Sequence, residues 1–227
     1  MEITCVQDLI DIVDKCEHLG CLYRGESDYS YTLKPSLARY SEAAKKINFD
    51  LESKEVAAVR ILMAELPQYF AKNINSYIEH LSIAQHHGLP TRLLDWSLSP
   101  LIALYFAVSE NKGKDAGMYV FNPNGLEWLN DSNIDKDAEK IDKVFIYHAK
   151  HLTPRLRSQQ GVFSFHFDLD NEYKHSGLTK YRIPAEKMND IKWQLMQLGI
   201  TDKVVYGDLD GLCSTLAISH FKGIISI

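Results

Sequence analysis

Apolar residues recur at helical spacing in several segments of the chain, with shorter apolar or alternating runs between them. The predicted helices cover residues 6–18, 50–70, 75–87, 100–108 and 185–198. The predicted strands cover residues 21–25, 91–95, 117–121, 144–148, 161–167 and 180–183. Because several helices fall between the first two strands, the pattern predicts an α+β fold with a helical N-terminal half. It favours a mixed or antiparallel central sheet over a doubly wound parallel one.

Two helix starts have clear capping signals. Ser99 can cap a helix and Pro100 fits its first position, where a missing N–H costs nothing. The eight residues that follow are apolar on every side, so this helix is expected to be buried on most faces. Asp208 can cap a final helix that runs to about His220.

Length and composition fit one folded domain. The chain has 227 residues and a net charge of −5, and no linker divides it; residues 127–143 read as a charged surface excursion. The acidic balance argues against a protein whose main task is to clamp a nucleic-acid backbone. No apolar run approaches the roughly 20 residues that cross a bilayer, and the N-terminus does not have the layout of a secretory signal. A cytoplasmic protein is therefore expected.

Metal binding is not expected from the sequence. The four cysteines are scattered at 5, 16, 21 and 213, which favours free thiols over a zinc site. The acidic pairs at 168/170 and 208/210 lie beside turn or cap residues, where aspartate is common for local hydrogen bonding.

Candidate chemistry begins at Arg24, which stands in an otherwise apolar strand with Gly25 directly after it. A rigid strand there can aim a guanidinium at a phosphate or ribose, while the glycine lets a ligand approach the backbone closely. The alternative is an edge-strand arginine whose stem reaches out to water.

The densest polar stretch, residues 86–97, joins the end of one helix to the start of the buried one. Loops of this kind between buried elements are where sites tend to be built. Two structural alternatives stay open: His86 as a cation favoured at a helix end, and an Arg92–Asp95 ion pair that only staples the loop. A third polar stretch, with Arg155, Arg157 and Gln159-Gln160, precedes the strand at 161–167.

Several blocks of the sequence resemble the FRG domain, which is named for a Phe/Tyr-Arg-Gly motif. These blocks are Leu22-Tyr23-Arg24-Gly25, the stretch from Gln85 to Trp96, Ala103 to Ala107, Gln159 to Phe163 and Asp208 to Leu212. The resemblance runs over about residues 20–216 and implies a single FRG domain across 1–227. That domain is found in bacterial and phage proteins and gives little indication of function, so a toxin, a defence effector and a metabolic role all stay open.

The order of these pieces is also similar to that of ADP-ribosyltransferases, whose site is assembled from three strands. Tyr23-Arg24-Gly25 matches the first piece, and residues 91–97 leading into the buried helix match the second. The third piece falls at Gln159-Gln160, where that family carries a glutamate in place of Gln160. The similarity implies an ADP-ribosyltransferase-like fold that takes NAD as substrate, with no metal.

The same similarity implies roles for individual residues. Arg24, His87 and Gln160 are expected to be catalytic and to converge on one cleft. The residues expected to bind NAD are Tyr23, Arg24, Gly25, His86, Thr91, Arg92, Asp95, Ser97 and Gln159. Since a glutamine amide lacks the negative charge that stabilises an oxocarbenium ion, hydrolysis is expected to be slow and Gln160→Glu to raise it.

Four functions follow from these residues. The leading one is an ADP-ribosyltransferase or NAD glycohydrolase, with a protein, a nucleic acid or water as acceptor. The second is a non-catalytic nucleotide or nucleic-acid sensor that uses Arg24, Arg92, Arg155 and Arg157 as an anion cleft. A metal-dependent nuclease built on His86, His87 and Asp95, and a protein-interaction module, are the remaining two.

Overall fold

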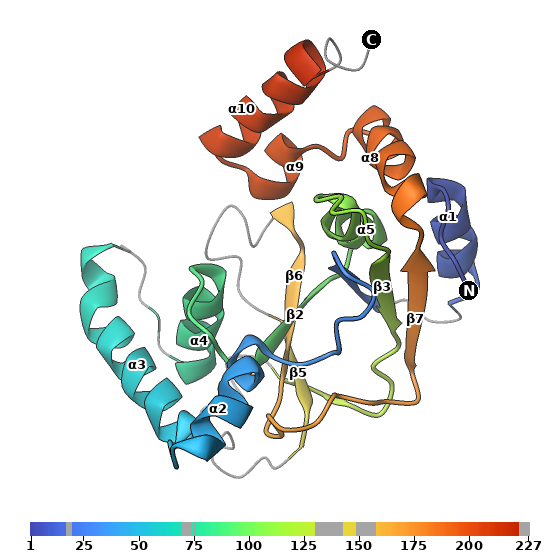
Figure 1. The fold of residues 1–227 in the computed structure, drawn as a ribbon. Coiled ribbons are helices and arrows are strands. Elements are labelled where there is room, and N and C mark those ends of the chain that lie inside the picture. The colour runs from blue at the N-terminus through green and yellow to red at the C-terminus, as the bar shows by residue number, and fades with distance from the viewer. Residues whose placement is uncertain (17–19, 70–73, 75, 130–142, 149–157, 223–227) are drawn as a thin grey trace.

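The computed structural model describes residues 1–16, 20–69, 74, 76–129, 143–148 and 158–222. Its centre is a seven-stranded sheet in the order β4-β5-β6-β2-β1-β3-β7 (Figure 1). The strands are β1 (Leu22–Glu26), β2 (Leu93–Ser97), β3 (Ala116–Phe121), β4 (Glu127–Leu129), β5 (Phe145–Tyr147), β6 (Gly161–Phe165) and β7 (Leu178–Ile183). Neighbouring strands pair antiparallel, except β4 and β5, which pair parallel. The predicted α+β fold with a mixed sheet is confirmed.

The helices form two groups around this sheet (Figure 1). The α-helices are α1 (Val6–Asp14), α2 (Ser41–Lys46), α3 (Leu51–Glu65), α4 (Tyr77–His86), α5 (Pro100–Val108), α8 (Met188–Gln197), α9 (Asp202–Tyr206) and α10 (Leu209–Ala217). Short 3₁₀ turns cover Ser36–Tyr40, Leu66–Gln68 and Ala185–Lys187, and a π-helical turn covers Ile218–Lys222. Helices α2, α3 and α4 lie between β1 and β2 in the chain, where α3 and α4 were predicted, and gather on one side of the molecule.

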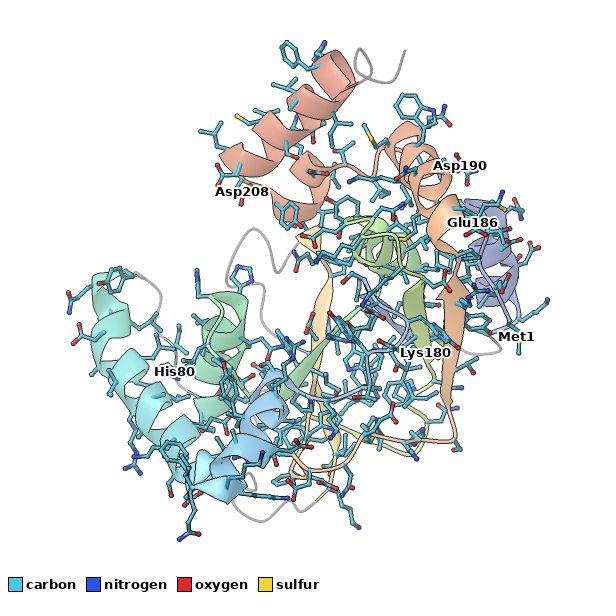
Figure 2. All side chains as sticks on the ribbon, in the orientation of Figure 1. Met1, His80, Lys180, Glu186, Asp190 and Asp208 are labelled. Atoms are coloured by element: carbon cyan, nitrogen blue, oxygen red, sulfur yellow. The ribbon has the colours of Figure 1, made fainter. Side chains whose placement is uncertain are left out.

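Local capping explains where the best-predicted helices begin. The N–H of Ile102 donates to Oγ of Ser99 at 3.4 Å, and Pro100 occupies the first turn of α5. Ser76 and Glu79 form a reciprocal capping box at the start of α4. Asp208, labelled in Figure 2 at the start of α10, accepts from the N–H of Gly211 at 2.8 Å. These starts agree with the sequence because capping depends on residues close together in the chain.

Several predicted boundaries are wrong. The helix predicted over 50–70 ends at Glu65, where Pro67 falls in a 3₁₀ turn, and the helix predicted from Ala185 begins with a 3₁₀ turn before α8. The strand predicted over 91–95 is β2 at 93–97, since the N–H of Arg92 bonds the Glu55 carboxylate instead. The helices α2 and α9 and the strand β4 were not predicted. Of the expected excursion at 127–143, only residues 127–129 and 143 are described.

Helix α5 packs directly on β1, and Gly25 makes this packing feasible. A Cβ built on Gly25 would lie 2.0 Å from the backbone oxygen of Ala103 and 2.5 Å from the backbone nitrogen of Ala107. The close approach that was expected of a ligand at Gly25 is therefore made by a helix. Ala103 and Ala107 are themselves fully buried in the main apolar core.

We expect Gly25→Ala to lower the free energy of unfolding by about 3 kcal/mol, because the added methyl overlaps backbone that cannot move aside. Urea unfolding measures the change. Gly117→Ala on the neighbouring strand is the matched control, since its nearest contact would be the flexible end of Lys180 at 3.1 Å. A loss from Gly25→Ala no larger than that of the control would mean that α5 shifts freely on the sheet.

A buried hydrogen-bond chain joins β2 to β6. Trp96 Nε1 donates to Ser164 Oγ at 2.8 Å, so the Ser164 hydroxyl is free to donate to Nε2 of His166 at 2.7 Å. This arrangement assigns His166 the neutral form with Nε2 as acceptor. Burial, together with the charge of Arg24, lowers the pKa of His166 to about 3.

We expect His166 to make the protein less stable as the pH falls. The unfolded chain takes up the proton near pH 6.5, whereas the folded one takes it up near pH 3, so each pH unit between them costs about 1.4 kcal/mol. From pH 6.5 to 5 this amounts to about 2 kcal/mol. Urea unfolding across this range should give a smaller pH slope for His166→Gln than for the wild type. Equal slopes would show that His166 titrates alike in both states.

Within the described part of the chain, no helix combines the length and apolar character needed to span a membrane. The four cysteines are free thiols, of which Cys21 is buried.

Candidate functional site

A cavity of about 370 Å³ opens beside the centre of the sheet, where β1, β2 and the start of β6 lie next to each other. Helices α4 and α5 contribute further walls. The lining residues are Tyr23, Arg24, Gly25, Glu26, Ser27, Gln85, His86, Asp95, Trp96, Ser97, Ala103, Phe106, Ser109, Glu110, Gln159, Gly161 and Phe163. The cavity therefore joins segments that lie far apart in the sequence.

Arg24 lies between two carboxylates in this cavity. Its Nε donates to Oε1 of Glu26 at 2.8 Å, and its Nη1 donates to Oδ1 of Asp95 at 2.6 Å and to the backbone oxygen of Asp95 at 2.9 Å. Burial alone would lower the pKa of Arg24, but the two carboxylates outweigh it and raise that pKa. The guanidinium is thus fixed in place and permanently charged.

Asp95 is held on one side and open on the other. Its Oδ1 accepts from Arg24 and from Nε2 of Gln85 at 3.1 Å, and Thr91 in turn donates its hydroxyl to Oε1 of Gln85. The side chain is still 64% exposed. Desolvation by the cavity walls opposes ionisation of this carboxylate, but the charge and hydrogen bond of Arg24 prevail and lower the pKa of Asp95. The result is an ionised, oriented carboxylate that can face a ligand.

The rim of the cavity is tied together by Ser97. Its hydroxyl donates to the backbone oxygen of Gln159 at 2.8 Å and accepts from the N–H of Ser99 at 3.0 Å. The N–H of Leu98 donates to the backbone oxygen of Gln160 at 3.1 Å. These bonds fix the end of β2 against the start of β6.

Seven residues expected in the site line the cavity: Tyr23, Arg24, Gly25, His86, Asp95, Ser97 and Gln159. Burial, followed by the effect of Cys16 and Cys21, raises the pKa of the Tyr23 hydroxyl to about 12, so this side chain stays neutral. The cavity lining therefore includes residues from all three of the sequence pieces that were expected to meet.

His87 and Gln160, two of the three expected catalytic residues, do not line the cavity, although their neighbours His86 and Gln159 do. His87 is exposed at the C-terminal end of α4. Gln160 adopts a left-handed backbone with φ of 48° just before β6. Of the three residues expected to converge on one cleft, Arg24 lines this cavity, whereas His87 and Gln160 do not. Sequence spacing cannot tell which of two adjacent polar residues faces inward at a helix or strand end.

Arg92 and Thr91 have structural partners. Arg92 is buried and its Nε lies 2.5 Å from Oε2 of Glu55, while its Nη1 lies 3.4 Å from Glu52. Burial raises the pKa of Glu55 despite the opposing charge of Arg92. The Arg92–Asp95 ion pair considered from the sequence is wrong, since Arg92 pairs with α3 and Asp95 with Arg24. Thr91 acts on the cavity only through Gln85.

The sequence reading missed two carboxylates of the lining, Glu26 and Glu110. Glu26 follows Arg24 by two residues on one strand, and side chains at that spacing share a face of a sheet, which is a signal the sequence offered. Glu110 follows the end of α5 and pairs with Lys112 at 2.6 Å. Among the lining residues, the single cation Arg24 stands against three carboxylates, Glu26, Asp95 and Glu110, so the lining has two excess negative charges with His86 counted as neutral.

Two of the other functions considered from the sequence were an anion cleft and a metal-dependent nuclease. Arg155 and Arg157 of the expected anion cleft lie outside the described residues. Across the described ranges, no group of three or more His, Cys, Asp or Glu side chains could hold a metal ion.

Comparison with known proteins gives one family. Residues 20–116 match the model of the family described as the FRG domain, and this segment runs from just before β1 to the first residue of β3. No curated protein and no solved structure matches the chain.

Proposed function

The chain carries an FRG domain, and we propose that its cavity binds NAD and breaks the bond between nicotinamide and ribose, as an ADP-ribosyltransferase or NAD glycohydrolase. One observation carries the proposal. The three pieces that resemble an ADP-ribosyltransferase site lie on β1, β2 and the start of β6, which are neighbours in the sheet, and all three contribute to one cavity. A role as a toxin or defence effector belongs to this proposal.

The charge of the cavity favours the nicotinamide end of NAD. That ring carries a positive charge until the glycosidic bond breaks, and the lining has three carboxylates against one cation. The aromatic residues Tyr23 and Phe106 are also part of the lining, and aromatic rings attract cations. The same charge disfavours a cleft that binds anions, which was the second function considered from the sequence.

The reaction moves one electron pair at a time. When the bond between C1′ and the ring nitrogen breaks, its electrons go to the nitrogen, and nicotinamide leaves as a neutral molecule. The positive charge passes to the ribose as an oxocarbenium ion. Water or an acceptor then adds a lone pair to C1′ and loses its proton to solvent.

Asp95 is the group we assign to stabilise that oxocarbenium ion. Its Oδ1 is held by Arg24 and Gln85, and the side chain is still 64% exposed. A carboxylate that is already oriented needs no reorganisation when the charge develops. In ADP-ribosyltransferases the resemblance gives this role to a glutamate at the position of Gln160, and we assign it to Asp95 instead.

Nicotinamide release tests the proposed function. The protein is incubated with NAD alone and then with NAD and a cell lysate, and free nicotinamide is measured by mass spectrometry. Release above that of a boiled sample supports the proposal, and release only with lysate indicates a transferase. If nicotinamide appears in neither sample, the cavity is not an NAD-cleaving site.

We expect Arg24→Lys to lower kcat/KM for NAD by about ten- to a hundredfold. An ammonium is a point charge and cannot hold both carboxylates as the planar guanidinium does, and each lost charge-assisted bond costs about 1.5–3 kcal/mol. Arg182→Lys is the matched control, because Arg182 likewise bridges two carboxylates, Asp115 at 2.7 Å and Glu2 at 2.5 Å, on the edge strand β7. Equal kcat/KM for Arg24→Lys and wild type would make Arg24 irrelevant to turnover.

A further inference from the structure

A second cavity, of about 290 Å³, adjoins the first through a shared residue. It is lined by Glu26, Tyr31, Thr32, Lys34 and Arg39. Glu26 also lines the first cavity, where it accepts from Arg24. All the lining residues come from β1 and from the segment between β1 and α2.

Two acidic residues near this second cavity, Glu26 and Asp170, form ion pairs with cations outside its lining. Glu26 is paired with Arg24 at 2.8 Å. The carboxylate of Asp170 is paired with Lys45 at 2.5 Å and also accepts from the hydroxyl of Ser41. Neither carboxylate therefore takes up the charge of the cations that line the cavity.

Lys34 and Arg39 are those cations, and neither forms an ion pair with a residue that the structure describes. Lys34 donates from Nζ to the backbone oxygen of Asp170 at 2.6 Å, which leaves two of its three N–H groups for a ligand, and its charge also contributes to the lowered pKa of Asp168. Arg39 is exposed and forms no ion pair with any residue the structure describes. Thr32 adds a hydroxyl to the same wall. The lining of the second cavity thus has two cations against the single carboxylate of Glu26, whereas the first has a negative excess.

We propose that this second cavity is the diphosphate subsite for a dinucleotide whose nicotinamide end occupies the first cavity. This inference rests on the proposed function. A planar guanidinium can hold two phosphate oxygens at once, and an ammonium suits a further oxygen as a point charge. Because Arg24 is taken up by Glu26 and Asp95, the pyrophosphate needs other cations, and Lys34 and Arg39 supply them. The substrate class is therefore a dinucleotide rather than a nicotinamide nucleoside.

Calorimetry with three probes tests the subsite. NAD has both the cationic ring and the diphosphate, ADP-ribose has only the diphosphate, and nicotinamide riboside has only the ring. Lys34→Met and Arg39→Met should each raise the Kd for NAD and ADP-ribose about tenfold, the effect of one lost charge-assisted contact. The Kd for nicotinamide riboside should stay within about twofold. Lys187→Met and Arg60→Met, which remove exposed cations elsewhere, are the matched controls.

The outcomes separate this inference from the function on which it rests. If wild type and both variants bind NAD equally, the diphosphate lies elsewhere and the subsite is wrong, while the proposed function stands. Equal losses for nicotinamide riboside and NAD would also overturn the subsite, since the cations would then act on the ring end or on folding. If the wild type binds none of the three probes, the proposed function fails and the subsite fails with it.

Discussion

Asp95→Asn is expected to lower the rate of nicotinamide release by about 10²–10³-fold, the usual effect of losing one oriented group that stabilises developing charge. The amide keeps the size of the carboxylate and can still accept from Arg24 and Gln85, so the fold and the cavity stay in place. The loss should therefore fall on kcat, with a smaller change in KM. Steady-state kinetics on NAD measures both.

Two further variants make this test specific to Asp95. Asp208→Asn makes the same chemical change at the start of α10, where asparagine caps a helix as well as aspartate does, and it should leave turnover unchanged. Gln160→Glu should also leave the rate unchanged, because Gln160 does not line the cavity. If Gln160→Glu raised the rate and Asp95→Asn did not lower it, the charge-stabilising position would be at the start of β6.

Arg92→Met is expected to lower the free energy of unfolding by about 3–5 kcal/mol, because it leaves the Glu55 carboxylate buried without its cation. The Glu55 side chain is 0% exposed. After the substitution, residue 92 would still donate its backbone N–H to Glu55, at 2.8 Å, but no longer a charged group. Methionine preserves most of the volume of the arginine stem, so little of the loss comes from a void. Urea unfolding at pH 7 measures the change.

The double variant Arg92→Met/Glu55→Leu separates charge from packing. Replacing both members of a buried pair by apolar residues is often close to neutral, so much of the lost stability should return. If Arg92→Met instead left stability unchanged and weakened NAD binding, Arg92 would be the ligand-binding residue that the sequence resemblance implied.

The segment that matches the FRG domain family supplies most of the cavity, but not all of it. Residues 20–116 include β1, α4, β2 and α5, and with them Arg24, His86 and Asp95. Strand β6, which adds Gly161 and Phe163 to the lining, and Gln159 just before it lie beyond that segment. Strand β6 pairs with β2 along its whole length. The cavity is therefore complete only when the later part of the chain closes onto the matched segment.

The sequence by itself determined the class of fold and the starts of α5 and α10, because both depend on short-range terms. Periodicity decides whether a segment is a helix or a strand, and a cap such as Ser99 acts on backbone groups within one turn. The position of Arg24 on a strand and the grouping of polar residues ahead of α5 were likewise readable from neighbours in the chain.

Only the tertiary structure decided which of these residues face the cavity. His86 lines it and His87 does not, and Gln159 lines it while Gln160 does not, because the inward direction depends on how α4 and β6 pack against β2. The partner of Arg92 is a carboxylate 37 residues away, and that of Arg24 lies 71 residues away. Such pairs form where segments distant in the sequence meet in the fold, and a local sequence pattern does not show which segments meet. Gly25 is a further example, because its lack of a side chain lets a helix that begins 75 residues later, at Pro100, pack closely on β1.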